Sequence, residues 1–570
     1  MLFIKKLWRV LWLISPILGF AQKTTFPTDP KVVAKGQMIF ENYCTACHNF
    51  SQKGIGPSLE RATTELPVEY LKKMIRNAPE VIASGDARAA MLFDEYKQMM
   101  PPFTSLKPTE IEAILAFIHQ NQKASPKDEY DAHALKNPIP APITSLGGQL
   151  RLAYHSTAPA TGTKAPLARI NKMQTLKGQK ERMFVVDLQG ILYEIIDKEW
   201  RVAFDIRKHR PHFISMPGMG TGFGSFAFHP DFYENGLLYT THAEKVRTAP
   251  ADFGYADSIR VTLQWVLTEW KIENPKATVF EGTGRELWRI NMVSGIHGVQ
   301  EITFNPLAQK GSDDYGLLYI GVGDGGASEH GFPRLCSSSR YVWGSVLRID
   351  PQGRNSRNGR YGIPTSNPFF NDSNPETVKE IYCRGFRNPN RITWTPDGKM
   401  LIDDIGHANI EELNIGIAGA DYGWPYREGT FVINPEGKMS HVYALPADEP
   451  AHRYTYPVIQ YDHDEGKAIS GGFVYDGAAI AALKGKYLFG DINNGRIFLA
   501  KNTDLKIGHQ APTEELEIWV DGQLTTFQKL NGINKPDPRL GVGPQGEIYI
   551  FTKADGKMYR VVNYLPNPKN

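Results

Sequence analysis

Six short segments of the chain share one pattern, and no other feature of the sequence restricts its fold more. Each has an apolar strand with alternating residues, a turn containing Gly, Pro or polar residues, and a second apolar strand, which predicts a β-hairpin. The copies occupy residues 183–195, 225–242, 301–326, 391–406, 471–492 and 540–553. Six hairpins within residues 146–565 predict a six-bladed β-propeller, because a closed ring of blades leaves few strand edges exposed.

The spacing of these hairpins is irregular, so we expect long inserted loops, which commonly carry function. The 53 Gly and 39 Pro residues suit a chain rich in turns. Two unrelated β domains are the alternative that the repeat leaves open.

A covalent haem attachment motif, C-x-x-C-H, occurs at Cys44, Cys47 and His48. Two thiols three positions apart can reach two vinyl groups of one porphyrin, and the adjacent imidazole then lies under the iron. A redox dithiol does not need the histidine, and a zinc site of this type needs a second C-x-x-C, which does not occur in the sequence. We therefore expect haem c within an all-α domain at residues 31–122.

The second axial ligand of this haem is expected to be Met100. It stands before Pro101 and Pro102, and this stretch resembles class I cytochromes c, in which the axial methionine precedes a proline. A thioether ligand raises the potential of haem iron and suits an electron carrier. Met99 and Met91 are the rival ligands.

Two helices are predicted in the same region. Residues 31–43 place Val33, Gly36, Ile39 and Phe40 on one face, and residues 109–120 carry an apolar stripe after a helix cap at their start.

The first 21 residues are typical of a secretory signal peptide. Lys5, Lys6 and Arg9 precede an apolar run over 10–20, and small residues lead to a cleavage site after Ala21. The run is short for a membrane anchor, which is the alternative reading. We expect a periplasmic or secreted protein that does not span a membrane.

Net charge and linker composition complete the organisation. The formal charge of +3 comes from those three N-terminal cations, and their removal leaves 61 Lys and Arg against 61 Asp and Glu. A neutral chain gives no electrostatic reason to expect nucleic acid as a partner. Residues 123–145 are polar and rich in proline, so they predict a semi-rigid linker between the two domains.

Seven ordered blocks of the second domain resemble the soluble quinoprotein glucose dehydrogenase and sorbosone dehydrogenase family. They are FAFHPDF (226–232), GDGG (323–326), GSVLRIDPQG (344–353), EIYCRGFRNPNRITWTPDG (380–398), IGHANIEELN (405–414), DYGWPYREG (421–429) and GKYLFGDINNGRIF (485–498). The resemblance covers roughly residues 165–565. It implies a six-bladed propeller that binds pyrroloquinoline quinone (PQQ) and calcium.

The same resemblance implies roles for individual residues. His297 would be the base that removes a sugar hydroxyl proton, a task that suits an imidazole at neutral pH. Asp324 would hold this histidine and stabilise its charged form. Arg387, with Asn388 beside it, would contact the cofactor and stabilise the reduced quinone.

Three further assignments follow from the resemblance alone. Arg496 would face the PQQ carboxylates. The backbone carbonyls of Gly406 and His407 would bind the calcium ion at the quinone, and Glu412 and Tyr422 would lie near a second calcium ion.

The chain departs from the family at several places, which disfavours glucose itself as the substrate. A glutamine is expected near Gly220, an acidic residue at Ile296 and a glutamine at Asn390. Lys467 is the one lysine that aligns, weakly, with a lysine for the PQQ carboxylates. Tyr461 and His463 are candidates to shape a different sugar site.

These features together predict an exported quinohaemoprotein dehydrogenase. It would oxidise an aldose or polyol with PQQ and calcium, pass electrons to haem c, and deliver them to a cytochrome or oxidase. Two alternatives stay open: a non-catalytic carbohydrate- or protein-binding propeller fused to an electron-transfer cytochrome, and a dehydrogenase with another cofactor. Whether Cys336 and Cys383 form a disulfide is also open, because spacing does not fix connectivity.

Overall fold

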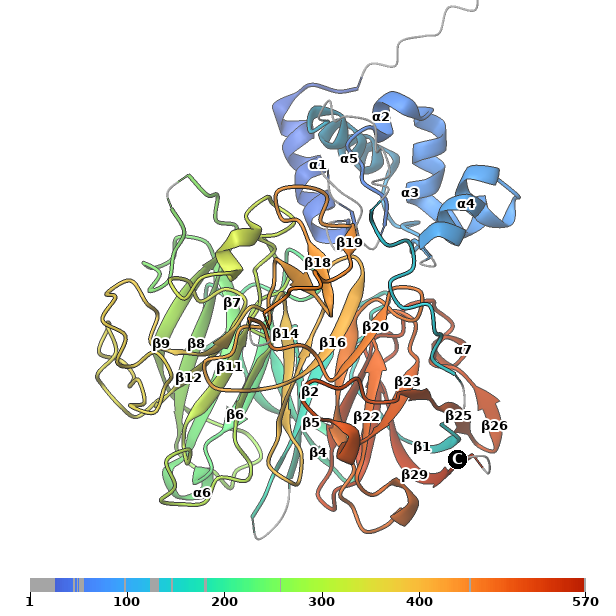
Figure 1. Cartoon of the computed structure of the whole chain (residues 1–570). Helices are drawn as coiled ribbons and strands as arrows, with labels where there is room; N and C mark the ends of the chain where they lie inside the picture. The colour runs from blue at the N-terminus through green and yellow to red at the C-terminus, as the bar shows by residue number, and fades with distance from the viewer. Residues whose placement is uncertain are drawn as a thin grey trace, which may run out of the picture.

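A computed structural model of the chain shows a helical domain beside a much larger β domain (Figure 1). It describes residues 26–44, 47–48, 50, 56–96, 99–122, 133–144, 147–178, 182–256, 258–450 and 453–567. The predicted signal peptide therefore lies outside the described residues. Among those residues no helix combines the length and the apolar character that a membrane crossing requires.

The helical domain contains five helices in its described part. They are α1 (Pro30–Tyr43), α2 (Ala62–Glu65), α3 (Val68–Ala83), α4 (Ala87–Tyr96) and α5 (Pro108–Gln120). The predicted apolar face of α1 is buried, and Ile39 and Phe40 pack with Ile114 of α5. Gly36 allows this close packing, because a Cβ there would lie 1.9 Å from the carbonyl oxygen of Ala113.

The start of α5 differs from the predicted helix cap at residue 109. The helix begins at Pro108, and the amide of Lys107 donates to the carboxylate of Glu110 at 3.0 Å. Proline is favoured at the first helical position, because its missing N–H has no partner there in any case. The expected cap is therefore wrong by two residues.

The β domain is built from six blades, each a sheet of at least four strands. The first three blades are β2 (Ile170–Leu176), β3 (Arg182–Asp187), β4 (Ile191–Ile196) and β5 (Glu199–Asp205); β6 (Phe223–Phe228), β7 (Leu237–Lys245), β8 (Leu263–Ile272) and β9 (Gly282–Met292); and β10 (Glu301–Phe304), β11 (Leu318–Val322), β12 (Ser345–Ile349) and β13 (Ile381–Arg384).

The remaining blades follow the same plan. They are β14 (Pro389–Trp394), β15 (Met400–Asp404), β16 (Ile410–Ile415) and β20 (Ile459–Asp462); β21 (Ile469–Val474), β22 (Lys486–Asp491), β23 (Ile497–Lys501) and β24 (Glu514–Glu515); and β27 (Pro538–Val542), β28 (Ile548–Thr552), β29 (Lys557–Leu565) and β1 (Gln149–Thr157), which β25 (Glu517–Val520) and β26 (Gln523–Thr525) extend. A small sheet of β17 (Arg427–Glu428), β18 (Phe431–Ile433) and β19 (Val442–Tyr443) is inserted before β20, and two short helices, α6 (Phe232–Asn235) and α7 (Phe527–Asn531), lie in loops.

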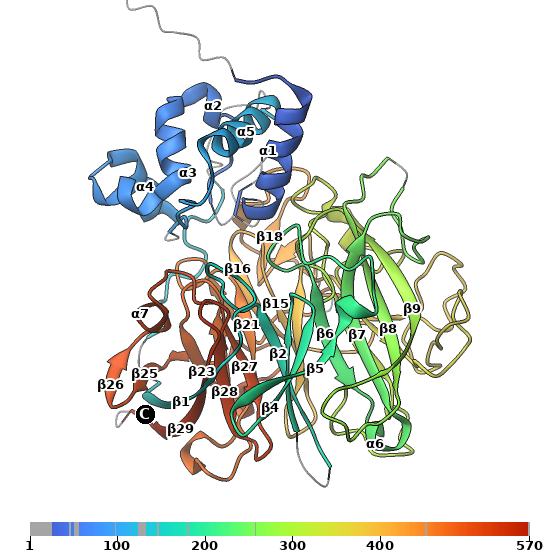
Figure 2. The same cartoon turned by 180° about the vertical axis from the view of Figure 1, so that it is seen from behind.

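The blades form a closed ring. The innermost strands β2, β6, β10, β14, β21 and β27 each contact the next one, and β27 contacts β2 again. Strand β1, from the start of the domain, pairs antiparallel with β29 from its end, so both ends of the domain share one blade. Figure 2 shows the β domain from behind, with the strands of the blades side by side. The predicted six-bladed propeller is confirmed, and two separate β domains are ruled out.

All six predicted hairpins are pairs of adjacent antiparallel strands. Five of them form the two innermost strands of a blade, whereas residues 183–195 form the middle strands β3 and β4. The innermost strand of that first blade, β2, escaped the pattern because Asn171 and Lys172 interrupt its apolar residues. Both side chains are buried and point to partners on other blades.

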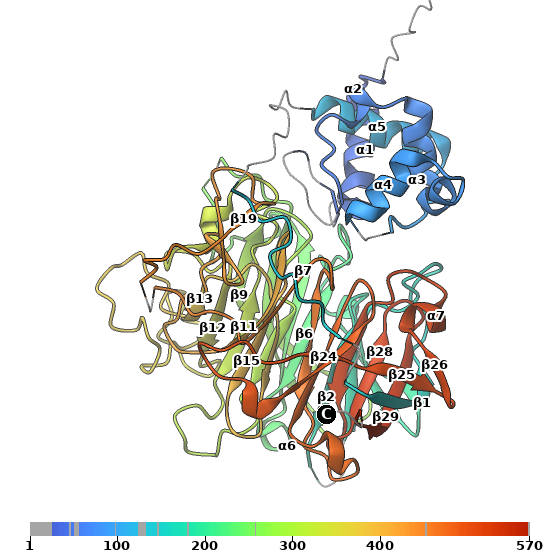
Figure 3. The ribbon, with the colours of Figure 1, turned by 45° about the vertical axis from the view of Figure 1, so that its right-hand side comes forward.

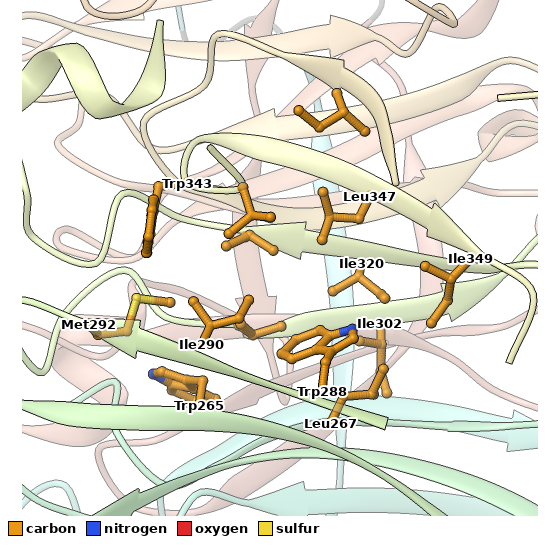
Figure 4. Packing of buried hydrophobic residues seen from close by; sticks show 14 of the residues in the cluster. Trp265, Leu267, Trp288, Ile290, Met292, Ile302, Ile320, Trp343, Leu347 and Ile349 are labelled. Carbon is orange, nitrogen blue, oxygen red and sulfur yellow. The ribbon is translucent and has the colours of Figure 1, made fainter. Parts of the chain in front are cut away.

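Packing between neighbouring blades is apolar, and packing at the centre of the ring is ionic. Figure 4 shows Trp265 and Trp288 of the second blade against Ile302, Ile320 and Leu347 of the third. Among the innermost strands, Glu301 accepts from Lys172 and from Arg391, each at 2.5 Å. These contacts tie the first, third and fourth blades together across the ring.

The helical domain lies over one end of the propeller in every view, as Figure 3 also shows. The described second half of the predicted linker, residues 133–144, runs along that end. Its amides donate to the propeller: Leu135 to the Val442 carbonyl at 2.8 Å, Ile139 to Asp462 at 3.2 Å and Ile143 to Glu465 at 3.0 Å.

Cys336 and Cys383 are buried free thiols in the structure, and burial raises the pKa of both.

Candidate active site and haem site

The haem attachment motif follows directly on the end of α1. The amide of Cys44 donates to Phe40 at 2.8 Å, and the amides of Cys47 and His48 both donate to the Cys44 carbonyl, at 3.0 and 2.9 Å. This turn brings both thiols and the imidazole to a single cavity of about 730 Å³. A second cavity of about 1460 Å³ adjoins it and is lined mainly by apolar side chains.

His48 is oriented for a metal. Its Nδ1 donates to the carbonyl of Pro57 at 2.8 Å, which leaves Nε2 with a lone pair. Burial lowers the pKa of His48, which favours the neutral, ligating form. Gly56 is required beside it, because a Cβ there would lie 2.6 Å from Cε1 of the imidazole.

Four methionines compete for the other axial position. Met100 lines both cavities, as does Met74 of α3, which the sequence analysis did not consider because no proline follows it. Met99 lines the smaller cavity alone, and Met91 lines the larger one with 53% of its surface exposed. Two thiols, an imidazole with a free Nε2 and thioethers around an apolar space fit a haem. The choice of Met100 stays a prediction.

A further cavity of about 990 Å³ lies at the end of the propeller that faces the helical domain. Most of its wall comes from the residues just before the innermost strands β6, β10, β14, β21 and β27. Because these strands run in the same direction around the ring, their starting ends meet at one place. This brings together side chains that are far apart in the sequence.

His297 and Asp324 are paired in this wall. The imidazole Nδ1 donates to the carboxylate of Asp324 at 2.7 Å, and the amides of Gly326 and Ser328 donate to the same carboxylate at 2.8 and 3.1 Å. Burial and the neighbouring Glu329 would raise the pKa of Asp324, but His297 and Arg387 bring it below its usual value. The pair thus has the geometry of an oriented base, with Nε2 left to accept a proton.

Arg387 is buried beside that pair. One of its Nη atoms donates to the carboxylate of Glu329, and the other donates to the carbonyls of Gly406, at 2.5 Å, and Ile405, at 3.2 Å. Burial would lower its pKa, but Glu329 and Asp324 raise it, so the guanidinium stays charged. The amide of Asn388 donates to Asp404 at 2.6 Å and fixes the same loop.

Glu329 was missed in the sequence analysis. Its carboxylate also lies 3.5 Å from Nδ1 of His407, and its second oxygen has no hydrogen-bond partner among the described residues. The available signal was that Glu329 is the one acidic residue between Asp324 and Asp350, directly after the GDGG turn.

The predicted calcium ligands contact other groups of the protein in this arrangement. Gly406 and His407 line the cavity, but the Gly406 carbonyl accepts from a guanidinium cation. The Tyr422 hydroxyl donates to Ile415, and burial raises the pKa of Glu412 to about 8, which favours its neutral form at pH 7. The calcium assignments stay predictions, and no step proposed below uses them.

Other cations line the cavity in the place expected for Arg496. Arg496 itself lies elsewhere, because its guanidinium is held by Glu465 and Glu515 at 2.5 and 2.8 Å. Lys467 is in the wall, together with three basic residues that the sequence analysis missed: Lys535, Arg539 and Lys553. They stand at the ends of innermost or adjoining strands, and this position in the sequence could have identified them as residues of the cavity wall.

These basic groups fit a polyanion. Burial lowers the pKa of Lys467 to about 8, and burial together with Arg539 lowers that of Lys553 to about 7. Three buried donor atoms in the wall have no partner within the described part of the chain: Nε of Arg387, Nη1 of Arg539 and Nδ2 of Asn493. Carboxylates of a bound cofactor would satisfy both the charges and the donors.

At Gly220, where the family resemblance implies a glutamine, the structure has a glutamine side chain from another blade. The side-chain amide of Gln300 donates to the Gly220 carbonyl at 2.7 Å, and it lies 2.8 Å from the position that a Cβ at Gly220 would take. Tyr461 and His463 do not line the cavity. Tyr461 is in the core with its hydroxyl on Asp491, and His463 lies 3.0 Å from Glu411.

The two sites meet. Cys47 and His48 of the haem motif line the same 990 Å³ cavity as His297 and Arg387, and Lys467 Nζ donates to the carbonyl of Tyr96 at the end of α4. Comparison with known families identifies both halves. A family model described as glucose / sorbosone dehydrogenase matches residues 172–560, well over half of the chain.

The chain belongs to the glucose/sorbosone dehydrogenase family. A cytochrome c family model matches residues 33–122. This family member is similar to HIPL1 protein of Arabidopsis thaliana, 25% identical over 57% of this chain and 51% of that one. It is also similar to human Hedgehog-interacting protein, 25% identical over 67% and 49%, and to quinoprotein glucose dehydrogenase B of Acinetobacter calcoaceticus, 25% identical over 38% and 42%.

The chain spans about half the length of the curated relatives it matches. Among solved structures it is similar to the PQQ-bound form of aldose sugar dehydrogenase from Streptomyces coelicolor. The identity is 17%, the TM-score is 0.48, and the match covers 74% of this chain and 99% of that one.

Proposed function

We propose that the protein is an exported quinohaemoprotein dehydrogenase, which oxidises a sugar hydroxyl with PQQ and passes the electrons to its own haem c. The observation that supports this most directly is the shared cavity. Its wall contains an oriented histidine base, a set of buried cations and the haem attachment motif. A two-electron oxidation next to a one-electron carrier needs no diffusing acceptor.

His297 would take the hydroxyl proton of the substrate on Nε2. Asp324 fixes the imidazole through Nδ1 and stabilises the imidazolium that forms. PQQ, when bound, would supply the acceptor for the hydride that leaves the carbon bearing this hydroxyl. The substrate would leave as a carbonyl compound, and His297 would hold the hydroxyl proton as an imidazolium beside Asp324.

The basic wall would hold the cofactor. Lys467, Arg539 and Lys553 would bind its carboxylates, and Asn493 offers a free amide donor. Arg387 would bind a quinone oxygen, and its pairing with Glu329 holds its guanidinium in the wall of the cavity.

In the helical domain, Cys44 and Cys47 would form the thioether bonds and His48 would bind the iron through Nε2. Met100 is the proposed second ligand, for which Met74 is the rival. A covalent haem supplies a one-electron carrier, which a soluble cytochrome or an oxidase outside the cytoplasm would reoxidise.

The test is reconstitution of the full chain with PQQ and calcium, followed by a panel of aldoses and polyols while the haem absorbance is recorded. Haem reduction that needs both PQQ and a sugar is the expected result. His297→Ala should abolish it and leave the haem spectrum intact, whereas His212→Ala, an exposed histidine outside the cavity, should have no effect. The proposal fails if PQQ does not bind in a fluorescence titration.

A binding protein is the second candidate, because Hedgehog-interacting protein matches 67% of this chain at 25% identity. That function predicts no PQQ binding and no sugar-dependent haem reduction, so the same experiment separates the two.

A further inference from the structure

The cavity of the propeller is covered by the helical domain. Loops of the blades form its wall, and Cys47 and His48 lie in its lining from the other side. Figures 1 and 3 show the helical domain above this end of the propeller. The wall of this cavity therefore comes from both domains, and a ligand bound in it lies between the propeller and the helical domain.

That space has to hold two molecules at once. The cations that fit a polyanionic cofactor occupy the wall near β21, β27 and β28, and the His297–Asp324 pair lies near β10 and β11. A sugar chain that extends from this site toward the helical domain would meet the haem motif, because Cys47 and His48 line the same cavity.

The cover is attached at two described places. Lys467 Nζ donates to the carbonyl of Tyr96 at the end of α4. On the linker side, Leu135, Ile139 and Ile143 are hydrogen-bonded to the propeller, so the tether to the helical domain begins on the propeller surface. Ten residues of sequence, 123–132, join that point to the end of the helical domain.

We infer that the haem domain is a lid over the sugar site, so that the docked chain accepts a free monosaccharide and a longer sugar binds only after the domain lifts. The inference rests on the proposed function. Its physical basis is a competition: a monosaccharide binds to either form, whereas an oligosaccharide binds to the undocked fraction alone. A chain that is undocked about a tenth of the time loses about tenfold in apparent affinity for the longer sugar.

The experiment changes the tether and leaves the site intact. Insertion of about 20 Gly and Ser residues after Pro126 triples the length of the ten-residue segment, and effective concentration falls as about the −3/2 power of tether length, so docking weakens about fivefold. The same insertion after Gly311, an exposed turn at the opposite end of the third blade, is the matched control.

The measurement is kcat/KM of the PQQ- and calcium-loaded chains with a diffusing phenazine dye as electron acceptor. The substrates are the monosaccharide that turns over best and its disaccharide and trisaccharide with the same reducing unit. We expect the trisaccharide to be about tenfold poorer than the monosaccharide in the parent chain. When docking weakens about fivefold, the undocked fraction rises from about a tenth to about a third. The Pro126 insertion should therefore raise the kcat/KM of the trisaccharide about threefold to fourfold and leave that of the monosaccharide within about twofold.

Two results would overturn the lid. One is a kcat/KM for the trisaccharide equal to that for the monosaccharide in the parent chain. The other is a ratio of these two kcat/KM values that the Pro126 insertion leaves unchanged. Failure of the proposed function looks different, since then no sugar of any length reduces the dye.

Hydrogen exchange tests, independently of turnover, whether the helical domain covers the cavity. Amides of residues 296–300 and 405–409 should exchange faster in the Pro126 insertion than in the Gly311 insertion. Equal exchange in both variants refutes docking over the site.

Discussion

Asp324→Asn is the change that tests the proposed base most sharply. The carboxylate is fully buried, accepts from Nδ1 of His297 at 2.7 Å and accepts two further backbone amides. Asparagine keeps the shape but removes the charge that stabilises the imidazolium. Two unit charges about 4 Å apart interact by about 4 kcal/mol at an effective dielectric constant of about 20.

Because about 1.4 kcal/mol is a factor of ten in rate, the expected loss in kcat is about 10³-fold. Steady-state haem reduction by sugar in the PQQ-loaded chain measures it. Asp314→Asn, in the loop at the opposite end of the same blade, is the matched control and should retain full activity. Thermal unfolding of both variants shows whether the propeller is intact.

A double-mutant cycle gives the decisive outcome. If Asp324 acts through His297, Asp324→Asn has little further effect in a His297→Ala background. The reasoning is refuted if Asp324→Asn lowers kcat by less than about tenfold, or if its effect is equally large without the histidine.

Four further predictions follow from the same contacts. Arg539→Ala should weaken PQQ binding about tenfold or more in a fluorescence titration, whereas Arg496→Ala, held by two glutamates outside the cavity, should leave it unchanged; equal effects would contradict the cavity assignment. PQQ binding should weaken as the pH rises from 6.5 to 8.5, because the protonated forms of Lys553 and Lys467, with pKa values of about 7 and about 8, attract the anion. The affinity should fall by up to about tenfold per pH unit for each proton taken up on binding. Binding that does not change with pH contradicts this prediction. Lys172→Met should lower the free energy of unfolding of the propeller by about 3–5 kcal/mol in denaturant, because it leaves the buried Glu301 carboxylate with one partner fewer. The exposed ion pair between Arg201 and Glu199 should contribute less than about 1 kcal/mol to the same free energy. Gly36→Val should destabilise the helical domain by about 3 kcal/mol or more, since its Cβ would overlap the Ala113 carbonyl, and unchanged thermal unfolding of that domain would refute the α1–α5 packing.

The fold was predictable because its signals are local. Hairpin alternation and the C-x-x-C-H spacing both act within a few residues, and both appear in the structure where the sequence placed them. Strand β2 was missed for a physical reason. Asn171 and Lys172 have partners on other blades, so their polarity serves the centre of the ring and hides the strand.

The site was only partly predictable. His297, Asp324 and Arg387 come from recognisable turns, and the structure brings them together. Arg496 was also assigned to the cofactor from the family resemblance, but local carboxylates at 2.5 and 2.8 Å hold its guanidinium, and it does not line the cavity. Glu329, Arg539 and Lys553 carried no motif, because a single charged residue in a loop is usually solvated.

By itself, then, the sequence determined the elements: six hairpins, the turn that carries the C-x-x-C-H motif, and the residues at the start of each innermost strand but the first. Only the tertiary structure decided which of the residues that precede the innermost strands share one cavity. It also decided that the haem motif lines that cavity. Closure of the ring gathers residues from distant blades at one end, and docking of the helical domain adds Cys47 and His48 to the same wall. Neither relation is encoded in local spacing, because both depend on contacts between segments hundreds of residues apart.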